Sequence, residues 1–314
     1  MAPRVESVAL RPAALVFNPK AGQRERSRSL DAILRALAES GYDTEAIPTQ
    51  AAGHAIEIAR SAAQRGVAAV FALGGDGTAR EVAEGLYLAA IPKTALGLLP
   101  GGTTNVLAKA LGIPCDPLAA ARAVAAYTPR PFDIGLANGK PFLMMVSVGL
   151  DVEALRATNS QLKRRFGRAA VGLAALKAWW TYDYPEFTVT ANGETHKATF
   201  VAVSNIELYG GKFRLAPRAQ FDDGKLDLVS FSGKGRWAML LFALALARGR
   251  HIERSDTRRR EIESAMAISA NQSSCAQIDG DVTAVRARFD IQMKAKAISI
   301  LARSDVGASK DTTR

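Results

Sequence analysis

Two glycine-rich segments contain the residue types that bind phosphate groups. The first is Gly74-Gly75-Asp76-Gly77-Thr78, and the second is Pro100-Gly101-Gly102-Thr103-Thr104-Asn105. Glycines let backbone N–H groups approach an anion closely, and a following helix adds partial positive charge at its N-terminus. Thr78 and Thr103 could add hydroxyl donors. Together the segments predict a cradle for a polyphosphate, although each alone is also typical of a plain strand-to-helix turn.

Asp76 is the unusual residue of the first segment. A carboxylate repels phosphate, so Asp76 is expected to hold Mg²⁺ or a substrate hydroxyl. Neither segment has the Lys and Ser/Thr pattern of a Walker loop, and neither reads G-x-G-x-x-G. The sequence therefore gives little support to a P-loop or dinucleotide-binding protein.

Each glycine segment follows a predicted strand and opens a predicted helix. Apolar residues at helical spacing over 30–41 and 55–65 predict further helices between strands. Strands that alternate with helices imply a parallel sheet covered on both faces, and such sheets bind ligands at the carboxyl ends of their strands. The predicted strands span residues 13–17, 45–48, 67–73 and 94–99.

After residue 132 the pattern changes to mainly antiparallel strands. Asn138-Gly139 and Asn192-Gly193 are strong hairpin signals, because both turn positions tolerate positive φ. Further strands are predicted at 226–231, 265–269, 286–291 and 297–301. We therefore expect an α/β domain with a parallel sheet over 1–132 and a mainly antiparallel β-sandwich over 133–303. The last strand either stays in the second domain or returns to the first, and 304–314 form a tail.

The composition restricts the class of protein. With 48% hydrophobic and 23% charged residues, the chain is globular rather than disordered or fibrous. Its net charge of +11 favours an anionic partner: nucleic acid, nucleotide or an acidic membrane. The two cysteines give no disulfide framework, and no signal peptide or membrane span is visible. A cytoplasmic protein is expected, with peripheral contact to the inner face of the membrane left open.

The ordered set of motifs resembles the diacylglycerol kinase catalytic domain. The nearest members are soluble bacterial lipid kinases, with sphingosine and ceramide kinases as relatives. The resemblance covers nearly the whole chain and implies an NAD kinase/diacylglycerol kinase-like first domain, with ATP in a cleft between the two domains. Besides the two glycine segments with Glu81-Val82 and Ala108-Lys109, it rests on Asn18-Pro19, Thr49 with Gly53-His54-Ala55, Asp133-Ile134-Gly135, the segment 216–227 and Asp279-Gly280-Asp281.

The resemblance also implies roles for individual residues. A structural Mg²⁺ is implied at 220–225, where Asp223 would give a carboxylate and Gln220 and Lys225 would give backbone carbonyls, since hard oxygen ligands suit Mg²⁺. Read without the family, that segment is merely a good turn. Glu81 and Asn105 would support the ATP site. Contacts to ATP are implied for Asn18, Thr49, Gly74, Gly75, Asp76, Gly77, Thr78, Gly102 and Thr103.

The last motif departs from the family pattern. The family usually ends it with Asp-Gly-Glu, whose Glu is the implied general base, whereas this chain has Asp281, shorter by roughly 1.5 Å. Phosphoryl transfer to an alcohol needs a carboxylate within about 3 Å of the hydroxyl to accept its proton. Asp281 is the first candidate, with Asp133 as the partner that orients it. Asp76 is the second candidate, and an impaired or altered activity is the third outcome.

Basic residues gather near apolar segments. Arg156 and the basic residues of 163–168 surround Phe166, and seven arginines lie between 236 and 260. The apolar run 237–247 is interpreted either as a core helix on the β domain or as a helix that lies on an anionic membrane. An aromatic group, which lines either a lipid path or a core, comprises Trp179, Trp180, Tyr182 and Tyr184.

The leading hypothesis is an ATP- and Mg²⁺-dependent lipid kinase. It would phosphorylate a hydroxyl of a membrane lipid, most simply diacylglycerol to give phosphatidic acid, with ceramide and sphingoid bases left open. One rival is a soluble NAD-kinase-type enzyme, which shares the Gly-Gly-Asp-Gly turn; another is a non-catalytic nucleotide- or lipid-binding protein. No nucleic-acid motif is present, and the three histidines show no zinc-ligand spacing. A free sheet edge in the β domain leaves a homodimer open.

Overall fold

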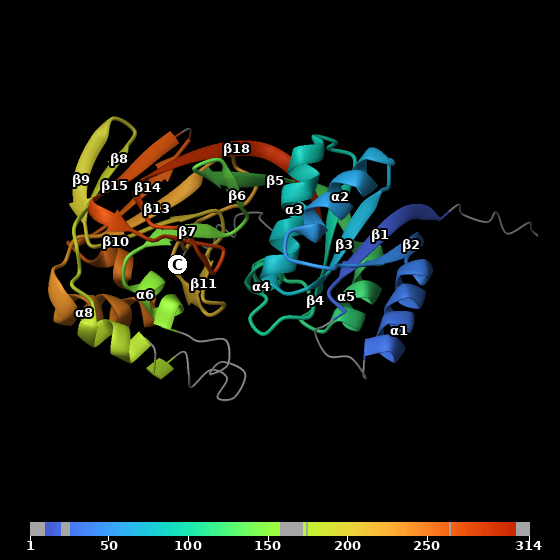
Figure 1. The fold of residues 1–314 in the computed structure, drawn as a ribbon, viewed down its shortest axis with the longest axis horizontal. Helices are drawn as coiled ribbons and strands as arrows, with labels where there is room; N and C mark the ends of the chain where they lie inside the picture. Colours follow the sequence, from blue (N-terminus) through green and yellow to red (C-terminus); the bar gives the residue numbers. More distant parts are fainter. Residues whose placement is uncertain (1–9, 20–25, 158–171, 174, 264, 306–314) are drawn as a thin grey trace, which may run out of the picture. The chain divides into compact units, whose positions relative to one another are not determined.

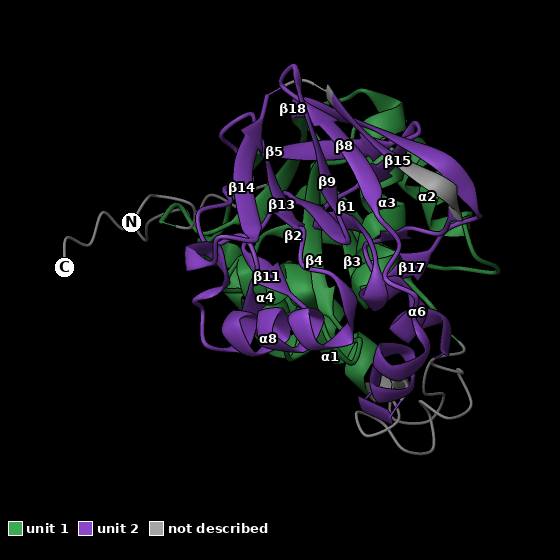
Figure 2. Cartoon of the chain, turned by 90° about the vertical axis from the view of Figure 1, so that its left-hand side faces the viewer, with its two compact units in different colours: residues 1–132, 296–314 green, residues 133–295 purple. Residues whose placement is uncertain are grey.

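The structure, a computed structural model, describes residues 10–19, 26–157, 172–173, 175–263 and 265–305 (Figure 1). The chain divides into two units (Figure 2). Unit 1 comprises residues 1–132 and 296–314, and unit 2 comprises residues 133–295. The basic cluster expected at 163–168 lies outside the described residues.

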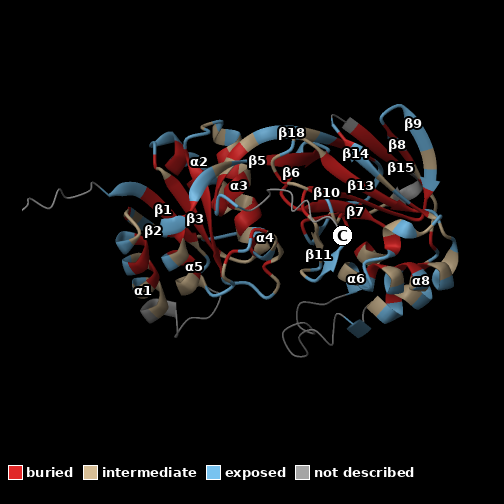
Figure 3. Ribbon diagram, turned by 180° about the vertical axis from the view of Figure 1, so that it is seen from behind, coloured by how far each residue is buried: buried red, intermediate tan, exposed pale blue. Residues whose placement is uncertain are grey.

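Unit 1 contains a parallel sheet with the strand order β2-β1-β3-β4. β3 and β4 are buried along almost their whole length (Figure 3), as expected for a parallel sheet covered on both faces. The C-terminal end of β18 extends this sheet by pairing in parallel with β4. The expected α/β fold is confirmed, with strands β1 (Arg11–Phe17), β2 (Tyr42–Pro48), β3 (Ala69–Gly74) and β4 (Ala95–Pro100).

Helices connect these strands. α2 packs against α3, and α1 packs against α5. At the start of α5, the Asp116 carboxylate accepts a hydrogen bond of 2.7 Å from the Ala119 N–H, and Pro117 occupies the first turn. Both features are favourable at a helix N-terminus. The helical elements are α1 (Arg26–Glu39), α2 (His54–Gln64), α3 (Asp76–Ala89), α4 (Val106–Ala110), α5 (Pro117–Ala123) and η1 (Val124–Ala126).

Unit 2 is built from antiparallel pairings. One sheet has six strands in the order β14-β13-β10-β7-β16-β17, and the other places β18, β15, β8 and β9 side by side. A third small sheet pairs β11 (Leu208–Tyr209) with β12 (Phe213–Arg214). The remaining strands are β5 (Thr128–Ala137), β6 (Lys140–Phe142), β7 (Met145–Val148), β8 (Phe187–Ala191), β9 (Glu194–Ala198), β10 (Phe200–Ser204), β13 (Leu226–Phe231), β14 (Thr257–Ile262), β15 (Ala265–Ser274), β16 (Gln277–Ile278), β17 (Asp281–Val282) and β18 (Arg286–Ala302).

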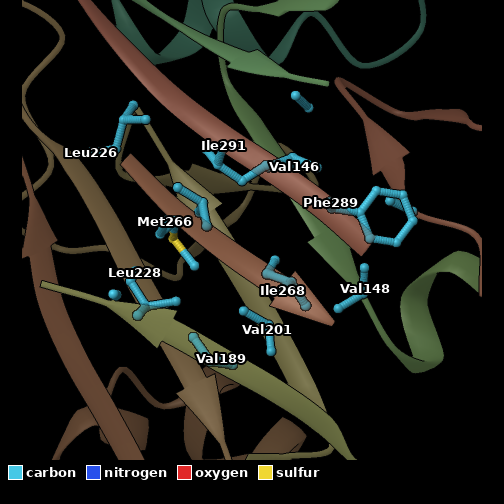
Figure 4. Close-up of a cluster of buried hydrophobic side chains, with 14 of the residues drawn as sticks. Val146, Val148, Val189, Val201, Leu226, Leu228, Met266, Ile268, Phe289 and Ile291 are labelled. Atoms are coloured by element: carbon cyan, nitrogen blue, oxygen red, sulfur yellow. The ribbon is translucent and has the colours of Figure 1, made fainter. Parts of the chain in front are cut away.

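The two larger sheets of unit 2 share one hydrophobic core. Val189, Ile268 and Phe289 come from one sheet, and Val201 and Leu228 come from the other (Figure 4). Each fully buried side chain of this size stabilises the fold by about 1.5–3 kcal/mol. This packing gives the antiparallel β domain that the sequence predicts.

The predicted Asn-Gly hairpins are confirmed. Asn138-Gly139 joins β5 to β6 and Asn192-Gly193 joins β8 to β9. Asn138 and Gly139 have φ of 48° and 81°, which is the left-handed region that this tight turn requires. The structure adds a third hairpin of the same kind, Asp279-Gly280, with φ of 49° and 89° between β16 and β17. The sequence analysis treats that pair only as part of a catalytic motif.

The last strand differs from expectation. β18 is a single element of 17 residues, whereas the sequence predicts two strands at 286–291 and 297–301. Lys296, with φ of 49°, is a left-handed residue within it. Residues 296–302 belong to unit 1, because this end pairs with β4. Of the two alternatives for the last strand, the structure corresponds to the one in which it returns to the first domain.

The helices of unit 2 are α6 (Leu150–Ala157), α8 (Gly235–Ala247) and η2 (His251–Glu253), with a further helical segment over 175–181. α8 occupies the apolar run 237–247. Across the described residues, no helix combines the length and the apolar character that crossing a membrane requires.

Candidate active site

The residues predicted to bind ATP gather at one edge of the unit 1 sheet. Asn18 follows β1, Thr49 follows β2, and the two glycine segments begin at the ends of β3 and β4. The Thr49 N–H donates to the Phe17 carbonyl over 2.8 Å, which ties the first two of these ends together. Asn18 is exposed and Thr49 is partly buried. Because the strands are parallel, four segments distant in sequence reach one edge.

The two glycine turns contact each other through their backbones. The Gly101 N–H donates to the Gly74 carbonyl over 2.7 Å. A Cβ atom added to Gly102 would lie 2.5 Å from the Gly75 Cα, and one added to Gly74 would lie 2.4 Å from the Thr78 hydroxyl oxygen. No side chain fits at Gly74 or Gly102 without movement of the turn. The glycines thus let the two turns pack closely and keep Gly77, Gly102 and Thr103 exposed.

Asn105 holds the second turn in shape. Its Oδ1 accepts from the Gly102 N–H at 3.0 Å, and its Nδ2 donates to the Gly102 carbonyl at 2.9 Å. Its φ of 50° is left-handed, a conformation that Asn tolerates well. These contacts fix the shape of the turn, and a role of Asn105 in supporting ATP stays a prediction. Glu81, the other residue expected to support the site, lies partly buried on α3.

Asp76 binds the N-terminus of α4. Its Oδ2 accepts from the Val106 N–H at 3.0 Å and its Oδ1 accepts from the Leu107 N–H at 3.2 Å. The carboxylate therefore satisfies two N–H groups that a helix start leaves unpaired, and it connects the first glycine turn to the helix after the second. A carboxylate has about four acceptor positions, so these bonds leave capacity for a ligand. The sequence does not reveal this positioning contact.

A hollow in unit 1 lies beside the glycine turns. Its volume is about 730 Å³, within the range of about 300–1,000 Å³ that small-molecule sites occupy. Phe17, Leu73 and Pro100 form walls at the strand ends, and Gly101 and Gly102 line it from the second turn. Leu30, Pro117 and the exposed Cys115 complete this part of the lining. Apolar walls beside the exposed second glycine turn suit a ligand with one flat apolar part and one polar part.

In unit 2, Asp133 is fully buried and held by the segment 220–225. Its Oδ2 accepts from the Gly224 N–H at 2.6 Å, and its own N–H donates to the Phe221 carbonyl at 2.7 Å. The Asn205 Nδ2 donates to its carbonyl at 2.8 Å. The contacts of Asp133 therefore fix the segment in which the metal ligands are predicted.

Asp223 is the carboxylate of that predicted metal site. Its Oδ1 accepts from the Lys225 N–H at 3.0 Å, and Gln220 is partly buried. Partial desolvation raises the pKa of Asp223, and the nearby Asp133 carboxylate raises it further. Two adjacent carboxylates are the environment that a divalent cation stabilises, so the residues fit Mg²⁺. In the part of the chain that the structure describes, no three His, Cys, Asp or Glu side chains converge on a metal position; backbone carbonyls would have to complete this site.

The Asp279-Gly280-Asp281 motif separates into an anchor and an exposed carboxylate. The Asp279 carboxylate accepts three backbone N–H groups, from Leu143 at 2.7 Å and from Met144 and Met145 at 2.9 Å. Asp281 is exposed on β17, directly after the turn. The motif thus fixes the hairpin through its first residue and presents its third residue to solvent.

A buried polar cluster supports the same hairpin and was not predicted. The Ser147 hydroxyl donates to Asp151 on α6, and Tyr209 also hydrogen-bonds to that carboxyl. Gln277 donates to the Ser147 hydroxyl at 2.9 Å and accepts from the Gly280 N–H at 2.7 Å. Burial raises the pKa of Asp151. In sequence Asp151 looks like an ordinary acidic residue in the first turn of a helix, so no signal marks this cluster.

The fold is that of an α/β protein with an attached β domain, and its two glycine turns lie at one edge of the parallel sheet, as in proteins that bind phosphate groups. Comparison with known proteins identifies the class. Residues 12–137 match the diacylglycerol kinase catalytic domain, and residues 144–302 match the YegS C-terminal NAD kinase beta sandwich-like domain. The chain is 32% identical over 246 residues to a diacylglycerol kinase of Bacillus subtilis, which covers 77% of this chain and 81% of that relative. A probable lipid kinase YegS-like of Chromohalobacter salexigens is 35% identical over 218 residues, 68% of this chain and 69% of the relative.

Solved structures show the same fold. A diacylglycerol kinase structure from Bacillus anthracis str. Sterne aligns with a TM-score of 0.71 at 22% identity, over 94% of this chain and 98% of that chain. A second structure from that organism reaches a TM-score of 0.79 at 24% identity, over 95% and 99%. The chain therefore belongs to the family of diacylglycerol kinase catalytic domains and YegS-like lipid kinases. It is an enzyme of the lipid kinase class, as the motifs predict.

Proposed function

We propose that this protein is an ATP- and Mg²⁺-dependent kinase of diacylglycerol. The observation that carries the proposal is the pair of interlocked glycine turns beside the hollow of unit 1. The exposed Gly77 N–H, in the first turn of α3, and the exposed Thr103 hydroxyl, which follows Gly102, would receive the phosphates. The apolar walls formed by Phe17 and Leu73 would receive the adenine ring. Asn18 and Thr49 would contact ATP at the same edge of the sheet.

The proposed chemistry is in-line phosphoryl transfer. The lipid hydroxyl oxygen forms a bond to the γ-phosphorus of ATP, the bond from that phosphorus to the β,γ-bridging oxygen breaks, and ADP leaves. Asp281 accepts the hydroxyl proton as general base, a contribution of about 10²–10⁴ in rate. Mg²⁺ supplies neutralisation of phosphate charge when bound. In the second domain, Asp223 and the carbonyls of Gln220 and Lys225 would hold a structural Mg²⁺.

The acceptor is tested with γ-labelled ATP and Mg²⁺ in mixed micelles. Diacylglycerol, monoacylglycerol, ceramide and a sphingoid base are presented separately, with NAD as the soluble acceptor. Label on diacylglycerol supports the proposal, and label on another lipid alone would replace the substrate. Label on NAD alone would make the protein a nucleotide kinase, and ATP binding without label anywhere would favour a non-catalytic binding protein.

The role of Asp281 is tested by substitution. Asp281→Asn should lower kcat by at least 100-fold with little change in ATP affinity, because only the proton acceptor is lost. Asp281→Glu restores the residue usual in the family and should keep most of the activity. Asp43→Asn, an exposed substitution on β2, controls for the loss of one charge. Full turnover in Asp281→Asn would remove this residue from the mechanism.

The position of ATP is tested through the two cysteines. Cys115 is exposed and lines the hollow, whereas Cys275 is partly buried in unit 2. Saturating ATP should slow alkylation of Cys115 by at least tenfold and leave the rate at Cys275 unchanged, as read by peptide mass spectrometry. Equal rates at Cys115 with and without bound ATP would place the nucleotide elsewhere.

A further inference from the structure

The helix α8 is apolar on two faces, and only one of them is covered. Met239, Phe242 and Leu246 are buried, and the Phe242 ring stacks on Phe231 with centroids 4.6 Å apart. On the other face Trp237, Leu241 and Leu244 are 65%, 55% and 42% exposed. These three follow each other at intervals of about one turn, so they form a single stripe. Figure 3 shows the exposed and partly exposed stretches along α8. The covered face matches the interpretation of this run as a core helix, and the other face is left exposed among the described residues.

The helical segment 175–181 continues the exposed stripe. The Trp179 indole N–H donates to the Arg236 carbonyl at the start of α8 over 2.7 Å, and its ring lies 5.5 Å from that of Trp237. Beside this junction Leu176 and Trp180 are 59% and 62% exposed. Five of the large apolar side chains exposed among the described residues lie on these two helical segments, and we call them the α8 surface: Leu176, Trp180, Trp237, Leu241 and Leu244.

The charged side chains within α8 and the helical segment 175–181 are all basic. Neither α8 nor the segment 175–181 contains Asp or Glu, whereas Lys177, Arg236 and Arg248 lie on or next to them. The Arg236 guanidinium stacks over the Trp180 ring at 4.5 Å from its centroid. The Arg248 guanidinium donates to the Leu244 carbonyl at 3.2 Å, at the C-terminal end of the stripe. Cations thus border the apolar stripe at both ends.

This combination fits a bilayer better than a second protein chain. Tryptophan and arginine at the border of an apolar stripe match the interfacial layer of a membrane, and each cation near an anionic leaflet favours binding. In a symmetric dimer the same patch would face itself, so the cations of both copies would enter one interface to which neither α8 nor the segment 175–181 brings an acidic residue. A helix of 13 residues is about 20 Å long, too short to cross the apolar core of about 30 Å.

We infer that the α8 surface docks the protein on an anionic lipid bilayer, with α8 lying in the plane of the interface. The inference deepens the proposed function by naming the surface through which the enzyme would reach a lipid substrate. Only the purpose of docking, which is access to a lipid substrate, depends on the proposed function. Docking itself is measured without ATP or turnover.

The tryptophans provide a direct test. All three tryptophans of the chain, Trp179, Trp180 and Trp237, lie in or next to the α8 surface. The full-length protein is titrated with phosphatidylcholine vesicles that contain 0 or about 30% phosphatidylglycerol, and binding is read by vesicle sedimentation and by tryptophan emission. We expect a blue shift and sedimentation with the anionic vesicles, at least tenfold weaker binding to the neutral ones, and loss of binding when high salt screens the charges.

A double variant identifies the surface. Leu241→Ser with Leu244→Ser changes two exposed side chains and keeps all three tryptophans as reporters. It should weaken binding to anionic vesicles at least tenfold while leaving the circular dichroism spectrum unchanged. Leu88→Ser, at a leucine that is 49% exposed on α3 of unit 1, is the matched control and should bind like the wild type.

The other outcomes overturn the inference. Equal binding of wild type and double variant would place the docking surface elsewhere, and equal binding to neutral and anionic vesicles would remove the role of charge. A dimer in sedimentation velocity that the double variant abolishes, with no vesicle binding, would make the α8 surface an interface between copies. Vesicle binding by a protein that phosphorylates no lipid would retain the inference and reject the proposed function.

Discussion

The contact between Asp76 and α4 makes a prediction that separates a structural carboxylate from a catalytic one. In Asp76→Asn only one side-chain oxygen remains, so either the Val106 or the Leu107 N–H loses its acceptor and faces an NH₂ group. The lost bond is to a charged group, worth about 1.5–3 kcal/mol, and the orphaned donor lies at a largely buried helix start. We expect the start of α4 to be destabilised by about 2 kcal/mol relative to the rest of unit 1.

Amide hydrogen exchange is the suitable assay, because all tryptophans lie in unit 2 and their fluorescence does not report on unit 1. A loss of 2 kcal/mol corresponds to roughly 30-fold faster exchange at the Val106 and Leu107 amides. Asp43→Asn, exposed on β2, should leave both rates within about twofold. Unchanged protection of α4 in Asp76→Asn, together with lost turnover, would refute the positioning role and return Asp76 to the position of metal ligand or base.

Three further predictions concern other parts of the fold. Gly102→Ala places a Cβ 2.5 Å from the Gly75 Cα, so calorimetry should show at least tenfold weaker ATP binding; unchanged affinity would contradict the contact between the turns. Asp279→Asn loses part of a buried carboxylate that accepts three N–H groups and should lower the unfolding free energy by about 2–4 kcal/mol in urea, read by tryptophan fluorescence, whereas the exposed Asp281→Asn should change it by less than about 0.5 kcal/mol. Burial raises the pKa of Asp227 from 3.8 to about 6, despite its ion pair with Arg259. The folded state therefore retains a proton that the unfolded state releases, and the contribution of Asp227 to stability should fall by about 3 kcal/mol between pH 4 and pH 6. Parallel pH curves for wild type and Asp227→Asn would contradict this reasoning.

Local signals in the sequence predict the elements of both units. Continuous apolar runs predict the buried parallel strands β3 and β4, since both faces of such strands are covered. Asn-Gly pairs predict two hairpins, because positive φ at both positions is nearly specific to that turn. These signals depend on residues within a few positions of each other, and this is why they are visible without a structure.

Long-range contacts are not visible in the same way. Asp76 lies 30 and 31 residues before the two α4 residues whose N–H groups it accepts. Asp279 lies 134 to 136 residues after the three residues whose N–H groups it accepts. No periodicity links such positions. The sequence also does not show which face of α8 is covered, because the run is apolar all round. The packing of the helix in unit 2 decides which face is buried.

The acidic residues of the motifs therefore divide into two groups by their exposure: three are buried or partly buried and two are exposed. Asp76 and Asp279 each accept at least two backbone N–H groups, and the buried Asp133 accepts the Gly224 N–H. Each of these three carboxylates fixes a turn or a helix start in the structure. Asp281 and Asp223, in contrast, are exposed. A carboxylate that must receive a proton or a cation needs access to it, whereas one that must hold a turn needs burial. The hairpin that carries Asp281 is fixed independently by Asp279 and by Gln277, so Asp281→Glu should lengthen the side chain without moving the backbone that carries it.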